Sequence, residues 1–592
     1  MNQVKKIRAT SQLELPLRKH ETPSTYDIYP THNIGDDLIQ ASYGSLAKVL
    51  TTFGFLKVDG YVGVLFEDVR RKLNEALLDI GVEAEWINVQ EAQKGEEKIE
   101  KMIAPFLGGD DPVFGKIADL ELKDFFDFNK MNSLVRSNPL KPVIFYGMGA
   151  SLVPVDGKTI YFDISKNEIQ FRSRAGAILN LGASQPDDPK KMYKRFYFID
   201  WVVLNKHKNQ IKNEISYLVD GQRSNEVTWV EGDVWRKNIL EITKNPIRVR
   251  PWFEPGAWGG QWIKDKIKGL PQDVVNYAWS FELIVPENGV IIESSGVLLE
   301  YSFDFLMFVA GERILGKDFQ TFHYDFPIRF NFLDTFDGGN LSIQCHPQKD
   351  FIKNHFGENI TQEETYYILD KKDDAQVYLG FQEGVTPDAF KEALLLSEQK
   401  NKQLDILSYV QSFDAEKHAL YLIPPGTIHS SGKNNLVLEI SSTKYLYTFK
   451  MYDWLRVDMD GKPRPINIER GMENLVFERA GKKVEEELIS KPLLIESNSE
   501  WELQYLPTHQ EHLYAIQRFK INTSVATTTG DQAHVLSLVE GDKIELITKG
   551  NTSVFHYAET FVLPAATEEY TIKNLSEKPV TVLRAFVKNT LA

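Results

Sequence analysis

Hydrophobic and polar residues alternate between strand-like and helix-like patterns in the first part of the chain. Residues 55–59 and 142–146 are short apolar runs of the kind that form buried strands. After the first run, apolar residues recur at helical spacing, at Val69, Leu73, Ala76, Leu77 and Ile80. Further strands are predicted at 159–164, 168–172 and 196–203, and helices near 114–134 and 206–219. This pattern predicts an α/β domain at residues 37–243, preceded by a polar arm at residues 1–36.

The second part of the chain is dominated by strand patterns. Residues 284–292 read as a hairpin around Asn288-Gly289, a pair typical of two-residue hairpin loops. Residues 386–412 read as helices inserted between strands. Further strands are predicted at 326–334, 341–347, 365–369, 436–440, 533–539, 543–548, 560–563 and 580–587. We expect a β domain at residues 244–497 with that helical insertion, and a second β domain at residues 498–592.

Composition narrows the class of protein. A chain of 592 residues is too long for one core, which agrees with several domains. The formal net charge of −15 argues against nucleic acid or an anionic membrane as the main partner. The single cysteine, Cys345, excludes an intramolecular disulfide framework. No run of eighteen apolar residues and no signal-peptide core are found, so we expect a cytoplasmic protein.

Four residues have side chains that can bind a metal ion and are spaced so that they could do so together. Gln344 and His346 are two apart in an apolar run, so both project from one face of a strand. The turn Pro424-Pro425-Gly426 delivers His429 at the start of another strand, and Glu364 opens the strand at 365–369. A lone histidine in a strand is more often a hydrogen-bonded core residue. The combination favours one Zn²⁺, or another divalent ion, per chain.

These residues also carry a family resemblance. Together with the segments 255–260, 326–334, 436–440 and 452–456, they are similar to class I (cupin-type) mannose-6-phosphate isomerases over residues 245–592. The resemblance implies a β jelly-roll (cupin) catalytic domain with a helical insertion and a C-terminal cupin-like β domain. It also implies zinc held by Gln344, His346, Glu364 and His429, and a sugar or sugar phosphate as the partner.

Three positions depart from the pattern of that family. Where the resemblance implies two lysines and an arginine, this chain has Asn331, Gln362 and Lys450. Such cations would hold a substrate phosphate and stabilise enediolate charge, so the metal site is similar while the phosphate site is altered. We assign substrate binding to Asn331, Gln362 and Arg456.

Two residues are candidates for catalysis. Lys450 is the candidate cation for the enediolate, with a solvated surface lysine as the alternative. Glu439 is the candidate for acid–base work, with an outward-facing strand carboxylate as the alternative. Arg456, which was assigned to substrate binding, has pairing with Asp458 as its own alternative.

The α/β domain offers no intact phosphate loop. Its turns at 60–63 and 147–151 have glycines after strands, as in kinase-like folds, but lack the Gly-Lys-Ser/Thr that cradles phosphates. A solvated face is expected for the basic residues Lys190, Lys191, Lys194, Arg195, Lys206, His207 and Lys208, with anion binding as the alternative. The role of this domain is undecided between structural, regulatory and a second activity.

Two functions therefore stay open. The first is a metal-dependent aldose–ketose isomerase of a hexose 6-phosphate or an unphosphorylated sugar. The second is a metal-containing carbohydrate-binding or regulatory protein without turnover. Convergence near the metal of cations such as Lys444, Arg456 or residues of the first domain would favour the isomerase.

Overall fold

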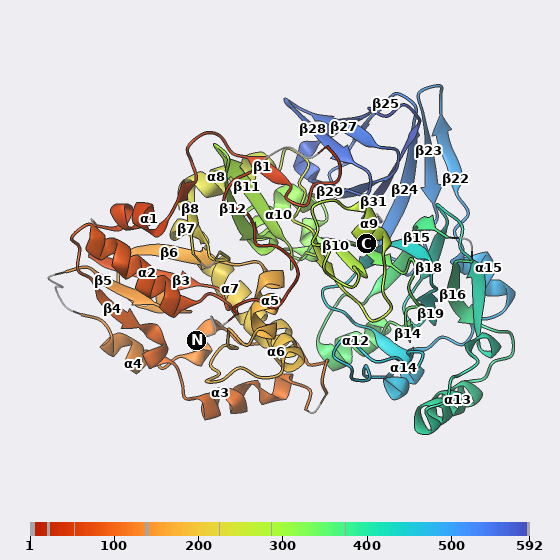
Figure 1. Ribbon diagram of the computed structural model, residues 1–592, viewed down its shortest axis with the longest axis horizontal. Coiled ribbons are helices and arrows are strands. Elements are labelled where there is room, and N and C mark those ends of the chain that lie inside the picture. The colour runs from red at the N-terminus through yellow and green to blue at the C-terminus, as the bar shows by residue number, and fades with distance from the viewer. Residues whose placement is uncertain are drawn as a thin grey trace. The chain divides into compact units, whose positions relative to one another are not determined.

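The computed structural model describes residues 6–19, 24–51, 54–109, 111–136, 141–223, 225–285, 287–372 and 374–588. The chain forms two compact units (Figure 1). The first contains the described residues of Met1–Thr22, Tyr29–Ile242 and Pro286–Gly311, and the second those of Pro23–Ile28, Thr243–Val285 and Glu312–Ala592. Within the expected polar arm, residues 1–5 and 20–23 lie outside the described residues.

The first unit is built on a seven-stranded sheet of order β2-β8-β7-β6-β3-β5-β4. The five strands from β7 to β4 run parallel, and β8 and β2 continue the sheet antiparallel. Their bounds are β2 (Gln40–Ala41), β3 (Phe55–Gly60), β4 (Glu85–Asn88), β5 (Val143–Tyr146), β6 (Lys158–Asp163), β7 (Ile215–Asp220) and β8 (Thr228–Glu231). The strands expected at 55–59, 142–146 and 159–164 are confirmed as β3, β5 and β6.

The helices of this unit are α1 (Tyr43–Leu50), α2 (Phe66–Asp79), α3 (Glu96–Ile103), α4 (Phe128–Ser133), α5 (Lys166–Arg174), α6 (Pro189–Arg195), α7 (Trp201–Ile211) and α8 (Gly232–Ile242). Short helical turns are η1 (Val89–Ala92), η2 (Ala104–Phe106), η3 (Leu122–Phe125), η4 (Ala150–Leu152) and the π-helical η5 (Phe196–Asp200). Helix α2 matches its apolar pattern, and Val69, Leu73, Ala76 and Leu77 are buried.

Two strand predictions in this unit are wrong. Residues 168–172 lie in helix α5, and residues 196–203 lie in η5 and α7. In α5 every residue from Lys166 to Ser173 is buried, so no polar face marks the helical period in the sequence. A short run of this kind cannot be assigned to strand or helix by periodicity alone. The helix expected at 206–219 also ends early, because α7 stops at Ile211 and β7 begins at Ile215.

The hairpin expected at 284–292 is also wrong. Strand β11 (Gly289–Ser294) pairs with β12 (Val297–Ser302), and β1 (Thr31–Asn33) joins β11 on its other side. The turn is Ser295-Gly296, whose positive φ angles of 47° and 81° suit a two-residue hairpin loop. Strand β10 (Trp279–Leu283) pairs instead with β9 (Trp252–Glu254) and β13 (Arg329–Asp334). Pro286 of the expected turn lies outside the described residues.

The second unit contains two antiparallel sheets that supply the candidate site. One has the order β18-β15-β20-β13-β10-β9 and the other the order β17-β16-β19-β14-β21. The remaining bounds are β14 (Ile343–Cys345), β15 (Glu363–Lys371), β16 (Gln376–Phe381), β17 (Val410–Asp414), β18 (Leu420–Ile423), β19 (His429–Ser431), β20 (Asn435–Ser442) and β21 (Phe449–Tyr452). The strands expected at 326–334, 365–369 and 436–440 correspond to β13, β15 and β20.

The helices that follow β9 in the chain are α9 (Trp262–Lys266), α10 (Phe303–Leu315), α11 (Phe319–Phe322), α12 (Lys349–Phe356), α13 (Pro387–Lys400), α14 (Ile468–Asn474) and α15 (Lys482–Leu488), with the turn η6 (Ile406–Ser408). Most of α10, up to Gly311, belongs to the first unit. The expected insertion at 386–412 is helical over α13, at the lower right in Figure 1, and in the short turn η6. Its later part is wrong, because β17 begins at Val410 and pairs with β16.

The last part of the chain forms two further antiparallel sheets. Their orders are β22-β23-β24-β31-β26-β29 and β25-β30-β27-β28. Their bounds are β22 (Leu493–Ser497), β23 (Trp501–Leu506), β24 (Tyr514–Ile521), β25 (Ser524–Thr528), β26 (His534–Glu540), β27 (Lys543–Thr548), β28 (Asn551–His556), β29 (Thr560–Leu563), η7 (Ala565–Thr567), β30 (Glu569–Asn574) and β31 (Val580–Val587). Residues of both sheets, such as Phe519 and Ile544, share one apolar core. The four strands expected here are confirmed as β26, β27, β29 and β31.

None of the described helices combines the length and the apolar character that a membrane crossing requires.

Candidate metal centre

Three buried side chains from separate segments converge in the second unit. His346 follows β14, Glu364 lies on β15 and His429 begins β19. One ligand atom from each lies within 4.8 Å of the others. Nε2 of His346 contacts Oε2 of Glu364, and Nε2 of His429 lies 3.6 Å from the same oxygen. The group therefore joins the six-stranded sheet, through Glu364, to the five-stranded sheet.

A glycine turn brings the two histidines together. Between β18 and β19, Gly426 has a φ of 80°, and a Cβ there would lie 2.4 Å from the Asn474 carbonyl oxygen. The Gly426 N–H also donates to the His346 carbonyl oxygen at 2.8 Å. Only glycine adopts this positive φ and fits this close to Asn474 without strain, which explains the glycine of the Pro-x-Gly-x-x-His sequence.

The backbone holds both imidazoles in the metal-binding tautomer. Nδ1 of His346 lies 2.8 Å from the Tyr447 carbonyl oxygen, and Nδ1 of His429 lies 2.9 Å from that of Thr427. Because a carbonyl oxygen can only accept, Nδ1 carries the proton and Nε2 presents a lone pair. Both lone pairs face Glu364.

The surroundings of His429 and Glu364 favour the protonation states in which these side chains bind metal ions. Burial lowers the pKa of His429, which favours the neutral imidazole that binds metals. Burial alone would raise the pKa of Glu364, but its interactions with His346 and His429 hold that pKa below its ordinary value. A carboxylate beside two imidazoles is a donor set that suits Zn²⁺ and related divalent ions. The residues present therefore fit such an ion.

Gln344, the fourth expected ligand, lies beside this group. Its Nε2 is 3.3 Å from Nε2 of His429, and its Oε1 accepts a hydrogen bond from Ser342 at 2.9 Å. Rotating the amide by 180° about its terminal bond would turn the oxygen toward His429. Cys345, between the two ligands, is buried with Sγ 3.9 Å from the Gly471 carbonyl oxygen, so it points elsewhere, as strand alternation predicts.

Two rows of side chains cross the six-stranded sheet beside Glu364. Residues that are paired across antiparallel strands project from the same face. The register places Arg329, Ser441 and Glu364 in one row across β13, β20 and β15. Asn331, Glu439 and Tyr366 form the next row on the same face. All six are buried, so this face lies in the interior.

Glu439 points inward, so its outward-facing alternative is wrong. Its carboxylate accepts hydrogen bonds from Asn331 Nδ2 at 3.0 Å and from Ser441 Oγ at 3.1 Å. Burial and the negative charge of Glu364 raise the pKa of Glu439 to about 8. A group with such a pKa exchanges protons readily near neutral pH.

Several polar atoms around this group have no hydrogen bond within the described part of the chain. They are Oδ1 of Asn331, Oε1 of Gln362 and the hydroxyl of Tyr366. Gln362 lies two residues before Glu364 and is buried. Buried polar atoms normally have partners, so their clustering is consistent with a polar ligand in this interior.

Lys450 lies on the five-stranded sheet. The register pairs Gln344 with His429 on one side and with Lys450 on the other, so the three share a row. Lys450 is partly buried. It therefore flanks the group from the sheet opposite Glu439.

The cations that were expected to decide between the two functions are engaged elsewhere. Lys444 pairs with Asp325 at 2.6 Å, and Arg456 pairs with Asp453 at 2.7 Å rather than with Asp458. Arg329 is the cation that sequence reasoning missed. The signal was available, because alternation in β13 puts Arg329 on the face of Asn331.

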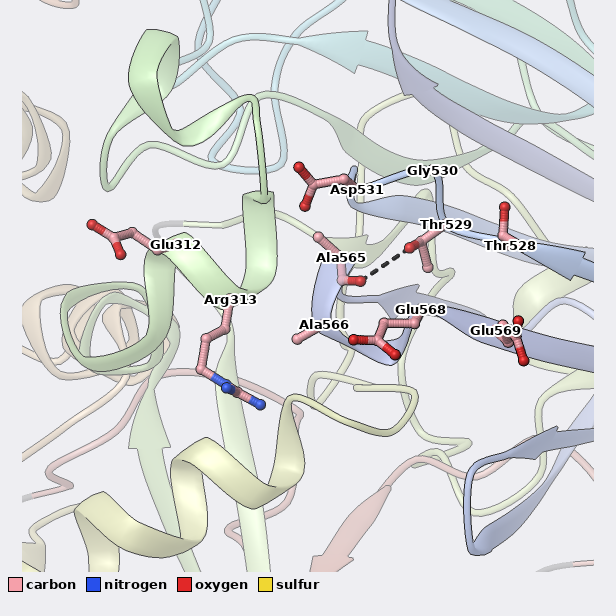
Figure 2. A pocket seen from close by; sticks show the side chains of 10 residues that line it. All are labelled: Glu312, Arg313, Thr528, Thr529, Gly530, Asp531, Ala565, Ala566, Glu568 and Glu569. Carbon is pink, nitrogen blue, oxygen red and sulfur yellow. Dashed lines mark hydrogen bonds between the residues drawn. The ribbon is translucent and has the colours of Figure 1, made fainter.

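A cavity of about 490 Å³ lies elsewhere in the second unit (Figure 2). Its lining is mainly acidic and hydroxyl-bearing, and Thr529 donates a hydrogen bond to the Ala565 carbonyl oxygen at 3.0 Å. The lining residues are Glu312, Arg313, Thr528, Thr529, Gly530, Asp531, Ala565, Ala566, Glu568 and Glu569. It contains none of the predicted site residues.

In the first unit, the expectation of a solvated basic face fails for four residues. Lys194, Arg195, His207 and Lys208 are buried. Lys208 binds Asp163 at 2.9 Å and His207 binds Asp59 at 3.1 Å, so both meet carboxylates at strand ends. A cavity of about 680 Å³ lies beside the turns after β3 and β5, where Glu67 and Asp68 occupy the first turn of α2. Acidic residues there disfavour a bound phosphate.

Comparisons with known proteins found one family model and several named relatives. Residues 42–244 match a family model described as a domain of unknown function, DUF8485. The probable mannose-6-phosphate isomerase GmuF of Bacillus subtilis (strain 168) is 25% identical over 334 residues, 56% of this chain and 98% of that protein. The mannose-6-phosphate isomerase ManA of the same organism is 25% identical over 232 residues, 39% of this chain and 68% of that protein. A crystal structure of the mannose 6-phosphate isomerase from Bacillus subtilis covers 57% of this chain and 99% of its own, at 19% identity and a TM-score of 0.46.

Proposed function

We propose that this chain is a metal-dependent aldose–ketose isomerase that interconverts mannose 6-phosphate and fructose 6-phosphate through an enediol. The observation that carries the proposal is the convergence of His346, Glu364 and His429, with both Nε2 atoms facing one carboxylate. Relatives named mannose-6-phosphate isomerase, at 25% identity, support the reaction class. We assign the activity to the part of residues 244–497 that lies in the second unit, within a cupin-type fold.

In this proposal Gln344, His346, Glu364 and His429 hold a divalent ion, with Zn²⁺ favoured by the two imidazoles. When bound, such an ion polarises the sugar carbonyl or the adjacent hydroxyl as a Lewis acid. The carbonyl contacts at Nδ1 fix the imidazole orientations before the ion arrives. The buried interior excludes bulk water, which strengthens every electrostatic interaction there.

Glu439 moves the proton between carbons. It takes the proton from C2 of the aldose, the C–H electron pair forms the C1–C2 double bond of the enediol, and the proton returns to C1. The O2 hydroxyl gives up its proton as O1 gains one, so the ketose has the same composition as the aldose. A carboxylate whose pKa is about 8 is suited to both directions of this transfer. Lys450, from the opposite sheet, offers positive charge to the enediolate oxygens.

The first test is turnover of mannose 6-phosphate to fructose 6-phosphate by zinc-loaded protein, with metal content measured alongside. We expect turnover in the wild type, and loss of both turnover and bound metal in His429→Ala. Stoichiometric metal without turnover of any hexose phosphate would contradict the proposed activity and leave two alternatives, an isomerase of an unphosphorylated sugar and a carbohydrate-binding protein.

A further inference from the structure

Arg329 is a buried cation that makes no direct ion pair within the described residues, although its charge opposes the rise in the pKa of Glu439. Its side chain is only 8% exposed, and its Nε is shielded from solvent. Within the described residues, it forms neither a hydrogen bond nor an ion pair. A guanidinium carries five N–H donors, and burying its charge unpaired is costly. An arrangement of this kind is retained where a ligand supplies the missing anion.

Three other buried or partly buried arginines of the second unit have carboxylate partners, whereas Arg518 and Arg584 bind neutral groups. Arg248 binds Glu559 at 2.8 Å, and Arg464 forms a bidentate ion pair with Asp453 at 2.5 and 2.6 Å. Arg479 binds Glu511 at 2.6 Å. Arg329 differs from all three because no carboxylate pairs with it directly within the described residues. It lies on β13, which has a neighbouring strand on each side.

The position of Arg329 directs it toward the metal-binding group. It shares a row with Ser441 and Glu364, two strands away, which is roughly 10 Å between backbones at the usual strand spacing. The carboxylate in the next row, Glu439, already accepts hydrogen bonds from Asn331 and Ser441. Arg329 is therefore a cation on the interior face, and the carboxylate of the next row is hydrogen-bonded to other donors.

We infer that Arg329 is the oxyanion-binding residue of this site, offering a guanidinium fork to two oxygens of the substrate. This inference rests on the proposed function. It assigns to Arg329 the positive charge that the neutral side chains of Asn331 and Gln362 cannot supply. The oxyanion is either the phosphate of a phosphorylated sugar or the pair of oxygens at C1 and C2, and both have the geometry that arginine binds in a bidentate manner.

The test measures binding, so it can be read even if the protein proves not to be an isomerase. Zinc-loaded wild type, Arg329→Met and Arg329→Lys are titrated calorimetrically with inorganic phosphate and, separately, with mannonate, whose carboxylate lies at C1. We expect Arg329→Met to weaken binding of one of them by about tenfold to a hundredfold, since hydrogen bonds to charged groups contribute that much. Arg329→Lys keeps part of the affinity because it keeps the charge without the fork.

The outcome identifies the source of the oxyanion. Weaker phosphate binding assigns Arg329 to the phosphate, and weaker mannonate binding assigns it to the reacting oxygens. If both ligands bind Arg329→Met as tightly as wild type, or neither binds the wild type, the inference is overturned. The matched control is Arg518→Met, a similarly buried arginine of the C-terminal sheets that binds Gln504 at 2.8 Å.

A rescue variant separates a binding role from a structural one. Residue 331 lies on the same face as residue 329, so Asn331→Lys in the Arg329→Met background returns a cation to this interior. We expect it to restore much of the lost affinity. Metal content of all variants should equal that of the wild type, because none changes a ligand. A variant that loses both metal and anion would assign Arg329 to the scaffold instead.

Discussion

Glu439 illustrates how much a single residue depends on its neighbours. As part of an isolated strand it is an ordinary carboxylate, but here it lies beside Glu364 on a buried face. Burial and this like charge shift its pKa in the same direction, to about 8. The charge of Arg329 and hydrogen bonds from Asn331 and Ser441 oppose the shift, and the hydrogen bonds fix the orientation of the carboxylate.

At this scale we predict that Glu439→Gln lowers kcat by about a hundredfold to ten-thousandfold, the usual contribution of a positioned acid–base group. Metal content should not change, because Glu439 is not among the converging ligand atoms. Steady-state kinetics and metal analysis of the same preparation check both statements. Turnover within threefold of wild type would remove Glu439 from the proposed mechanism.

At the scale of the element, the turn between β18 and β19 decides where His429 lies. Gly426 has a positive φ and no room for a Cβ beside Asn474. Gly384, in the turn between β16 and α13, has a similar φ of 78° but nothing within 4 Å of an added Cβ. Substitution of Gly384 by alanine therefore introduces backbone strain alone, whereas substitution of Gly426 introduces both backbone strain and a steric clash.

We predict that Gly426→Ala destabilises the second unit by about 2 kcal/mol or more, and that Gly384→Ala costs only the strain of a left-handed alanine, about 1 kcal/mol. Gly426→Ala should also weaken zinc affinity, since the turn carries His429. Urea unfolding and zinc titration measure the two effects. Equal losses in both variants would show that the Asn474 contact is unimportant.

Strand partners were poorly predictable at this scale. The strand at 289–294 was found in the sequence, but its partner was not, because Asn288-Gly289 is a stronger local turn signal than Ser295-Gly296. Helix α5 was missed since it is buried on all sides and has no polar face. Local pattern therefore located a number of strands and failed where burial was uniform.

At the scale of the whole molecule, a buried cluster links stability to pH. Glu282 accepts hydrogen bonds from Tyr26 at 2.6 Å and from Ser280, near the Arg248–Glu559 pair. Burial raises the pKa of Glu282 to about 7. Between its ordinary pKa of about 4.5 and about 7, the folded protein holds a proton that the unfolded chain has lost.

Stability should therefore fall as pH rises through this window, by at most about 3 kcal/mol from this group. We predict that Glu282→Gln flattens the dependence between pH 5 and pH 7.5, because glutamine does not titrate. The measurement is the urea midpoint of the second unit at both pH values. Glu392→Gln, at an exposed position of α13, is the control and should leave the slope of wild type unchanged. An unaltered slope in Glu282→Gln would contradict the assignment.

The sequence by itself determined the candidate ligands, several strands of the β regions and the α/β character of the first part. These depend on period-two alternation, glycine turns and ligand spacing, which are local properties of the chain. Only the tertiary structure decided that Arg329, Asn331 and Glu439 share a buried face with Glu364, that Arg456 is occupied by Asp453, and that β11 pairs with β12. Each of these depends on register between segments distant in sequence, and register is fixed by the burial of whole faces rather than by any one segment.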